Sequence, residues 1–218
     1  MVMAGRPLAI PWIDENVPAI LNTWHLGTKA GDAIADILSG DTNPSGKLTA
    51  TFPRDVGQVP IFYSVKNTGR PFNKDNRYTS KYLDMPNEPL YPFGYGLSYT
   101  TFEYSDMKLN KQEIGFNDSL TVKVNVRNTG KYKGEEIVQL YTGDMVGSVT
   151  RPVKELKGFK KILLKPGEQK TVEFTISSDD LRFYDVDMNF TAEAGKFKAF
   201  VGTNSSIVLE AGFELVNT

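Results

Sequence analysis

The sequence predicts a two-part α+β chain, in which a partly helical segment, residues 1–98, precedes an all-β sandwich, residues 99–218. Three observations support this division. Apolar residues recur at helical spacing near residue 35, whereas apolar and polar residues alternate after residue 119. Between these regions lies a stretch rich in aromatic residues, glycine and proline, residues 90–102.

The first part carries signals for a strand and two helices. Residues 2–10 are mostly apolar and are expected to form a short buried strand, which would indicate an incomplete domain. Asn16 is suited to cap a helix that starts at Val17, with Pro18 in the first turn. A second helix is expected from about residue 28, with Gly40 as its C-terminal cap. Its apolar residues share one face: Ala30, Ala33, Ile34, Ile37 and Leu38.

An irregular segment and an aromatic segment follow. Residues 72–89 are polar and lack periodicity, so we expect a functional loop or a linker. Residues 90–102 read LYPFGYGLSYTTF. Proline fixes φ and glycine permits positive φ, so this stretch is neither a regular helix nor a central strand. Its aromatic side chains carry large apolar areas and should be buried. We therefore predict a packed seam, and use that name for residues 90–102.

The second part has the alternation of half-buried antiparallel strands. Leu120, Val122, Val124 and Val126 alternate with polar residues, which predicts one apolar face. About six or seven such strands, separated by turn signals, fit an immunoglobulin-like or fibronectin-type sandwich. Because the chain has no cysteine, the fibronectin type III-like form is favoured.

Composition restricts the partners. The 218 residues are 40% hydrophobic and 23% charged, as is typical of a soluble globular protein. A net charge of −1 gives no electrostatic reason to expect nucleic acid or an anionic membrane as a partner. No apolar run is long enough to span a membrane, and residues 1–4 are too short for a signal peptide. We expect neither nucleic-acid nor membrane binding.

No catalytic set is evident from the residues. His25 is the single histidine, and no G-x-S-x-G motif accompanies it, so a structural role is favoured over a Ser-His-Asp triad. One histidine without cysteine makes a zinc site improbable, and no nucleotide-binding glycine motif is present. Glycoside hydrolysis needs two acids that flank one bond. The neighbouring acids Asp14/Glu15 and Asp179/Asp180 are interpreted as helix or turn caps. We predict no catalytic residue, metal or cofactor.

Longer motifs carry a family resemblance. The chain resembles the C-terminal part of glycoside hydrolase family 3, most closely bacterial periplasmic β-glucosidases. The first part contributes GRPLAI (5–10), VPAIL (17–21), AIADILSGDTNPSGKL (33–48), TFPRDVGQVPIFY (51–63), NTGRP (67–71) and the seam. The second part contributes RPVKELKGF (151–159), LKPGE (164–168) and AGKFKAFVGTNSS (194–206).

The resemblance implies a three-domain parent enzyme: a (β/α)₈ barrel, an α/β sandwich domain and a fibronectin-like domain. This chain would be the last piece of the α/β sandwich, with its terminal strand and helices, and the complete third domain. The family's nucleophilic aspartate and acid/base glutamate would both lie upstream. Residues 27–31 read GTKAG where the family has GTEGG. The parent would hydrolyse terminal β-glucosyl residues in the periplasm or outside the cell, whereas this chain alone would be inactive and structural.

The loop at residues 69–89 could reach the rim of the parent's active site. Arginine and tyrosine suit sugar hydroxyls and sugar faces, so the candidate contacts to a β-glucoside or oligosaccharide are Arg70, Arg77, Tyr78 and Tyr82.

Three interpretations remain open from the sequence. A fragment of a β-glucosidase would expose the face of residues 1–65 and could self-associate through it. A free-standing fibronectin-like module would bind a glycan or a protein through sandwich loops. A complete small hydrolase would have to use His25.

Overall fold

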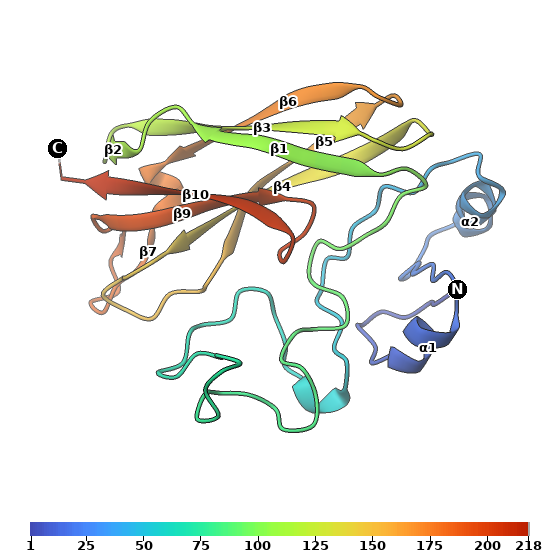
Figure 1. Ribbon diagram of the computed structural model, residues 1–218, viewed down its shortest axis with the longest axis horizontal. Coiled ribbons are helices and arrows are strands. Elements are labelled where there is room, and N and C mark those ends of the chain that lie inside the picture. The colour runs from blue at the N-terminus through green and yellow to red at the C-terminus, as the bar shows by residue number, and fades with distance from the viewer. Residues whose placement is uncertain (218) are drawn as a thin grey trace.

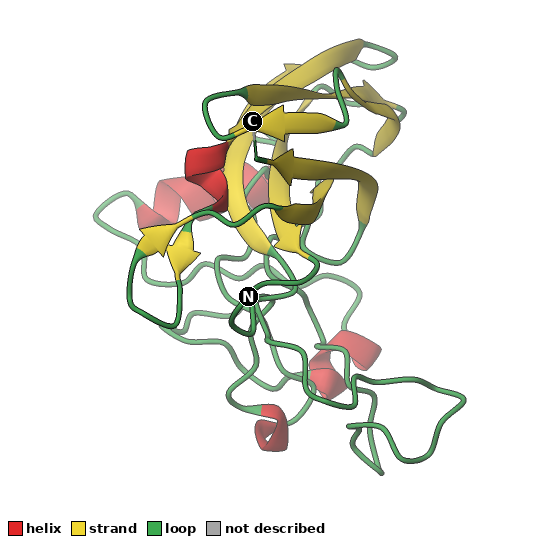
Figure 2. Ribbon diagram, turned by 90° about the vertical axis from the view of Figure 1, so that its left-hand side faces the viewer, coloured by secondary structure: helices red, strands yellow, loops and turns green. Residues whose placement is uncertain are grey.

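The computed structural model of the protein describes residues 1–217. The molecule has a β-sandwich at one end and an irregular, loop-rich part at the other, with the N-terminus in the latter and the C-terminus at the far end of the sandwich (Figure 1). Strands are therefore the main regular structure, and helices are few (Figure 2). Within the described residues, no helix is long and apolar enough to cross a membrane.

The sandwich has two sheets. The three-stranded sheet has the order β1 (Phe102–Leu109), β3 (Ser119–Asn128), β6 (Gln169–Ser177), and its strands are antiparallel. The five-stranded sheet has the order β2 (Glu113–Gly115), β10 (Val208–Val216), β9 (Gly195–Gly202), β4 (Gly134–Asp144), β5 (Glu155–Leu164). Only the short β2 pairs in parallel among these strands. A small hairpin joins β7 (Phe183–Tyr184) to β8 (Phe190–Thr191).

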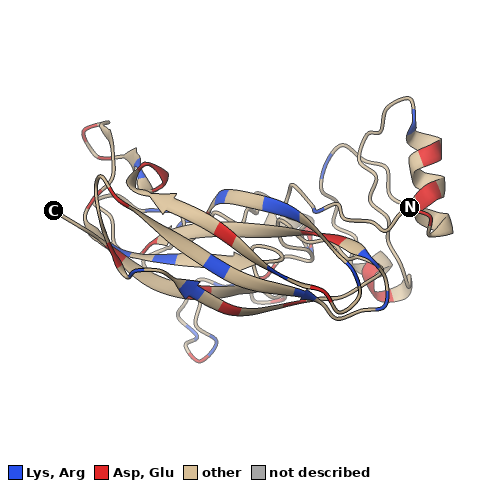
Figure 3. Ribbon diagram, turned by 90° about the horizontal axis from the view of Figure 1, so that it is seen from above, with Lys and Arg blue, Asp and Glu red and all other residues tan. Residues whose placement is uncertain are grey.

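The predicted alternation in β3 is confirmed. Leu120, Val122, Val124 and Val126 are all at most 1% exposed, and the first three pair with the apolar residues Ile176, Phe174 and Val172 of β6. The facing sheet contributes the other half of the core: Val138, Leu140, Ala199, Val201, Phe213 and Leu215. Burial of each such side chain stabilises the fold by about 1.5–3 kcal/mol. Positions of Lys and Arg are interspersed with positions of Asp and Glu along the strands (Figure 3).

The first part contains α1 (Pro11–Asn16), α2 (Ala30–Ser39) and the single 3₁₀ turn η1 (Val56–Gln58). The expected helix from Val17 is wrong, because α1 ends where that helix was to begin. Val17 is extended, with φ −118° and ψ 122°. The residue before a proline is driven from helical to extended backbone, whereas Pro11 occupies the first helical turn, where proline is favoured.

The prediction of a strand at residues 2–10 is also wrong. The segment forms only one isolated parallel bridge, between Val2 and Asn22. The helix predicted from the apolar spacing is confirmed as α2, and Gly40 ends it with a φ of 85°. No residue of α2 is buried, however, and Leu38 is 69% exposed. The apolar face of this helix is therefore only partly covered: Ile34 and Ile37 are half-buried, whereas Leu38 lies open.

The seam lies between the two parts. On one side, the Leu48 amide donates to the Tyr95 carbonyl at 2.7 Å. On the other side, the Ser205 amide of the sandwich donates to the Phe93 carbonyl at 3.0 Å. The packed seam is thus confirmed, but its aromatic side chains are only partly buried, and Tyr99 is 46% exposed. The expectation of full burial was wrong because the segment lies along the margin of the sandwich rather than inside it.

Candidate functional site

The loop at residues 69–89 is irregular but internally bonded. The Thr79 hydroxyl donates to the Asn73 and Asn76 carbonyls at 3.1 and 2.9 Å. The side-chain oxygens of Asn73 and Asn76 each accept a backbone N–H two residues later, from Asp75 and Tyr78. Such asparagine turns replace the backbone bonds of regular structure. They give this loop a defined shape without strands.

An open hollow of about 640 Å³ lies in this loop. Its lining combines one cation, two aromatic rings and two side-chain amides, and has no carboxylate and no imidazole. The lining residues are Arg70, Pro71, Phe72, Asn73, Asn76, Tyr78 and Thr79. Amides and guanidinium groups can bond to hydroxyls, and aromatic rings offer apolar faces. The hollow can therefore bind a polar, ring-shaped molecule, but it offers no acid for chemistry.

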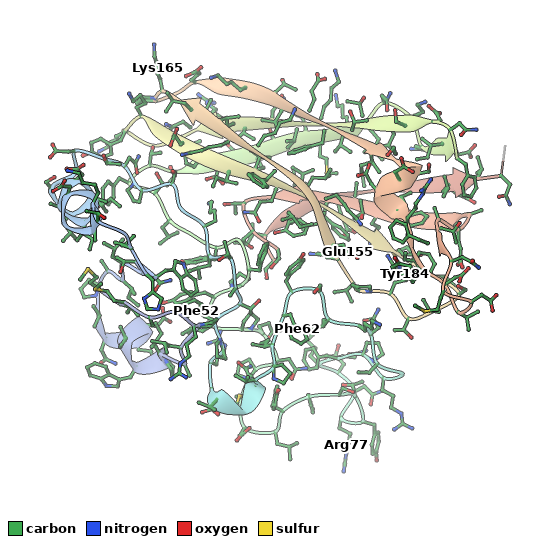
Figure 4. All side chains as sticks on the ribbon, turned by 180° about the vertical axis from the view of Figure 1, so that it is seen from behind. Phe52, Phe62, Arg77, Glu155, Lys165 and Tyr184 are labelled. Carbon is green, nitrogen blue, oxygen red and sulfur yellow. The ribbon has the colours of Figure 1, made fainter. Side chains whose placement is uncertain are left out.

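The structure brings three of the four predicted contacts together. Arg70 and Tyr78 line the hollow. The Arg77 guanidinium stacks on the Tyr78 ring at 5.1 Å, outside the lining, at the outer tip of the loop (Figure 4). Tyr82 lies beyond the hollow, where Asn87 accepts its amide N–H.

Sequence reasoning missed the other five residues of the lining, which are Pro71, Phe72, Asn73, Asn76 and Thr79. The signal that could have found the asparagines is their spacing to the following residues, which is typical of side-chain turns. Such turns fold the loop back on itself and so create a hollow.

The other candidate acids and His25 have structural contacts. Asp180 completes a capping box with Ser177 at the turn η2 (Ser178–Leu181), as expected. Asp14 is not a cap, because its Oδ1 accepts the Tyr91 hydroxyl, which ties α1 to the seam. Burial and this carboxylate raise the pKa of Tyr91. The imidazole of His25 lies against the backbone of Gly5.

Among residues 1–217, no group of three or more His, Cys, Asp or Glu side chains could hold a metal ion. The hollow in the loop is the candidate site for binding a ligand.

Comparison with known proteins identifies relatives of both parts. A family model described as the glycosyl hydrolase family 3 C-terminal domain matches residues 1–99, and one described as a fibronectin type III-like domain matches residues 136–205. The periplasmic beta-glucosidase of Salmonella typhimurium is 53% identical over 99% of this chain. A beta-xylosidase of Formosa agariphila is 48% identical over 94% of it. The chain spans only 28% of the length of either relative.

Solved structures give the same result. The beta-glucosidase from Listeria innocua in complex with glucose superposes with a TM-score of 0.92 and 44% identity, over 98% of this chain and 30% of that one. A D270A mutant of that enzyme in complex with laminaribiose superposes with a TM-score of 0.91 and 43% identity, over 99% and 30%. The similarity therefore extends along nearly the whole chain but covers less than a third of the larger proteins.

Proposed function

Because the chain belongs to glycosyl hydrolase family 3 as its C-terminal part, we propose that it completes and supports a β-glucosidase that hydrolyses terminal β-glucosyl residues. Residues 1–98 would be the last piece of that enzyme's α/β sandwich domain, and residues 99–218 its fibronectin type III-like domain. The enzyme would act on β-glucosides or oligosaccharides in the periplasm or outside the cell, as the name of the Salmonella typhimurium relative suggests.

The incompletely covered apolar face of α2 carries this proposal. An amphipathic helix in a complete domain packs its apolar stripe against a partner, but Leu38 is 69% exposed here and no residue of α2 is buried. Trp12 in α1, which is 68% exposed, adds a second exposed apolar side chain in the first part of the chain. The upstream part of the enzyme would cover this face.

The lone parallel bridge supports the same assignment. Parallel strands occur almost only in sheets covered on both faces, yet Val2 and Asn22 form a single bridge here. The side-chain nitrogen and oxygen of Asn22 are both buried without a hydrogen-bond partner among residues 1–217. Buried amides are normally bonded. A neighbouring strand of the α/β domain would supply the missing partners.

The hollow in the loop at residues 69–89 would contact the sugar. Arg70, Arg77 and Tyr78 lie together there, with Tyr82 further along the loop. Retaining hydrolysis needs two carboxyl groups about 5–5.5 Å apart, and the hollow has none in its lining. The loop would therefore contribute binding, while the upstream domains would supply the catalytic acids. A free-standing binding module is disfavoured by the similarity along nearly the whole chain.

A chimera tests the proposal. The matching C-terminal 28% of the Salmonella typhimurium relative is replaced with this chain, and hydrolysis of an aryl β-glucoside is measured for the chimera and for the chain alone. We expect turnover only in the chimera. Turnover by the chain alone, or a folded chimera without turnover, would contradict the assignment.

Substitutions in the same chimera test the covered face. Leu38→Asp places a charge on the apolar stripe of α2 and should abolish assembly, since an unpaired buried charge is strongly destabilising. Val186→Asp is the matched control, because Val186 is 77% exposed on the distant hairpin and should leave turnover unchanged. In the isolated chain, Leu38→Asp should also reduce any self-association through residues 1–65, as measured by sedimentation velocity.

Arg70 tests the sugar contact. In the chimera, Arg70→Ala should raise KM for a disaccharide such as laminaribiose by about tenfold, because a charge-assisted hydrogen bond is lost. Lys165→Ala, on the turn at the opposite side of the molecule (Figure 4), is the control. An unchanged KM in Arg70→Ala would remove this residue from the proposed binding surface.

A further inference from the structure

The sandwich holds both ends of the loop at residues 69–89. At the entry to the loop, the Val153 amide donates to the Val65 carbonyl at 2.9 Å, and Lys66 forms an isolated bridge with Pro152. These contacts join the loop's N-terminal end to the segment that leads into β5.

At the exit from the loop, two sandwich residues bond to the seam. The Ser205 amide, from the turn between β9 and β10, donates to the Phe93 carbonyl at 3.0 Å. The Gln139 side chain, in β4, donates to the Gly94 carbonyl at 3.2 Å. Gln139 is 3% exposed, so this bond is shielded from water. The C-terminal end of the loop is therefore also fixed to the five-stranded sheet.

One side chain joins the two ends. The Tyr63 ring stacks on Phe93 with centroids 4.4 Å apart and planes at 26°. Its edge contacts the buried Tyr141 ring of β4 at 5.7 Å. Its hydroxyl accepts the Leu156 amide of β5 at 3.2 Å. Tyr63 lies just before the loop begins. It contacts Phe93, which follows the end of the loop, and it also contacts two strands of the sandwich, β4 and β5. Aromatic pairs of this kind add about 0.5–1.5 kcal/mol each beyond area burial.

Between its ends, the loop keeps its shape by its own asparagine and threonine bonds. Its shape is therefore set locally, whereas its position is set at its two ends. The first part of the chain adds further contacts at the exit: the Gln58 side chain donates to the Pro86 and Glu88 carbonyls at 3.0 and 3.4 Å, and the Arg54 guanidinium donates to the Glu88 carbonyl at 3.1 Å.

We infer that the sandwich positions the loop at residues 69–89 relative to the rest of the enzyme, with Tyr63 as the positioning residue that locks both ends together. Displacement of a binding group by even about 1 Å can cost much of its effect. The statement about loop position concerns this chain alone, whereas its consequence for sugar binding rests on the proposed function.

Amide hydrogen exchange in this chain tests the inference directly. The amides of Val153 and Ser205 report on the two ends, because their acceptors are Val65 and Phe93. Tyr63→Leu removes both ring contacts and should speed exchange at these two amides by about tenfold through local opening. Tyr63→Phe keeps the ring and should speed exchange only at Leu156, whose amide loses its acceptor. Amides of β3 should be unaffected in both variants.

Tyr184→Leu is the matched control, because Tyr184 is 59% exposed on the β7–β8 hairpin and its ring packs on Phe190 of the same hairpin rather than on either end of the loop. It should change neither reporter amide. The inference is overturned if Tyr63→Leu leaves Val153 and Ser205 unchanged. It is equally overturned if exchange in β3 rises by the same factor, since that result would show a general loss of stability.

Kinetics in the chimera test the consequence for binding. Tyr63→Leu should raise KM for laminaribiose by about tenfold, with kcat within about twofold, because the loop contributes binding and not chemistry. Tyr63→Phe should restore KM. A chimera without any turnover would refute the proposed function but leave the exchange result valid. An active chimera with unchanged KM would refute the link between loop position and sugar binding.

Discussion

The two parts of the chain are joined by a buried ion pair, and its removal gives the sharpest stability prediction. Lys47 Nζ lies 3.1 Å from Glu136 Oε2, and the two side chains are only 10% and 3% exposed. The ammonium also donates to the Gly96 carbonyl and the Thr203 hydroxyl, each at 3.0 Å. The Tyr104 hydroxyl donates to Glu136 at 2.8 Å. Burial and this carboxylate raise the pKa of Tyr104.

The cost of losing one partner follows from this geometry. Lys47→Met removes the ammonium and leaves the Glu136 carboxylate with the Tyr104 hydroxyl. Removal of one member of a buried pair typically costs about 3–5 kcal/mol, because the remaining charge is uncompensated. For a chain of this length, Tm falls by about 2–4 °C per kcal/mol. Lys47→Met should therefore lower Tm by roughly 10 °C.

Removal of both partners should cost less than removal of one. Lys47→Met with Glu136→Leu eliminates both charges, and the remaining loss is that of the hydrogen bonds that the neutral groups of Gly96, Thr203 and Tyr104 made to the pair, about 1–2 kcal/mol. The pair would then fix the relative placement of the two parts without adding much net stability, which is how many buried ion pairs behave.

Urea unfolding of the wild type, both single variants and the double variant completes a double-mutant cycle. Lys198→Met is the matched control, because its ion pair with Glu210, at 2.7 Å, is substantially exposed and should cost less than about 1 kcal/mol. A cost of Lys47→Met below about 1 kcal/mol, or a double variant equal to the sum of the singles, would refute the reasoning.

Three further predictions concern single residues. Gly94→Ala should cost about 2–4 kcal/mol in thermal melts, because Gly94 has a φ of 79° and an added Cβ would lie 2.1 Å from the Gln139 side-chain oxygen. Asn128→Ala should lower the free energy of unfolding, measured in urea, by a similar amount, since the fully buried side-chain amide of Asn128 takes part in four hydrogen bonds. Burial raises the pKa of Asp144 above 3.8, so its contribution to stability is full below that value and is lost as pH rises through the folded-state pKa. The stability of Asp144→Asn relative to the wild type should therefore increase between pH 4 and pH 7. Thermal melts of both proteins that differ by the same Tm at the two pH values would contradict this.

The sandwich could be predicted from the sequence because its signals are local. Each strand is buried by neighbours within the same chain, so the alternation at Leu120, Val122 and Val124 directly reports the burial found in β3. The sheet order could not be predicted, since β4 pairs not only with β5, the next strand along the chain, but also with β9, which lies far away in the sequence.

In the first part, the apolar pattern predicts a helix but not how far its apolar face is buried. The spacing of Ile34, Ile37 and Leu38 predicted α2 correctly, yet no residue of that helix is buried. The helix expected at Val17 failed for a different reason, because the pattern was given more weight than the restriction imposed by Pro18. Period and burial are thus separate properties, and only the former can be obtained from spacing.

The candidate site shows the same separation between residue type and geometry. Composition drew attention to Arg70 and Tyr78, which line the hollow, and equally to Tyr82, which does not. The hollow itself depends on the side-chain turns at Asn73 and Asn76, and a turn brings together residues that composition alone cannot arrange. Aromatic and cationic residues therefore identify a loop more reliably than they identify its binding surface.

The two glycines of the seam, Gly94 and Gly96, are required for different reasons. The sequence pattern suggests that both allow a positive φ, and Gly94 does have a positive φ. Gly96 has no positive φ, but an added Cβ would lie 2.3 Å from the Gly46 carbonyl oxygen. It is required because two backbones approach closely, beside the carbonyl that accepts Lys47. The seam can therefore contact both parts at once only because one glycine permits the turn and the other permits the approach.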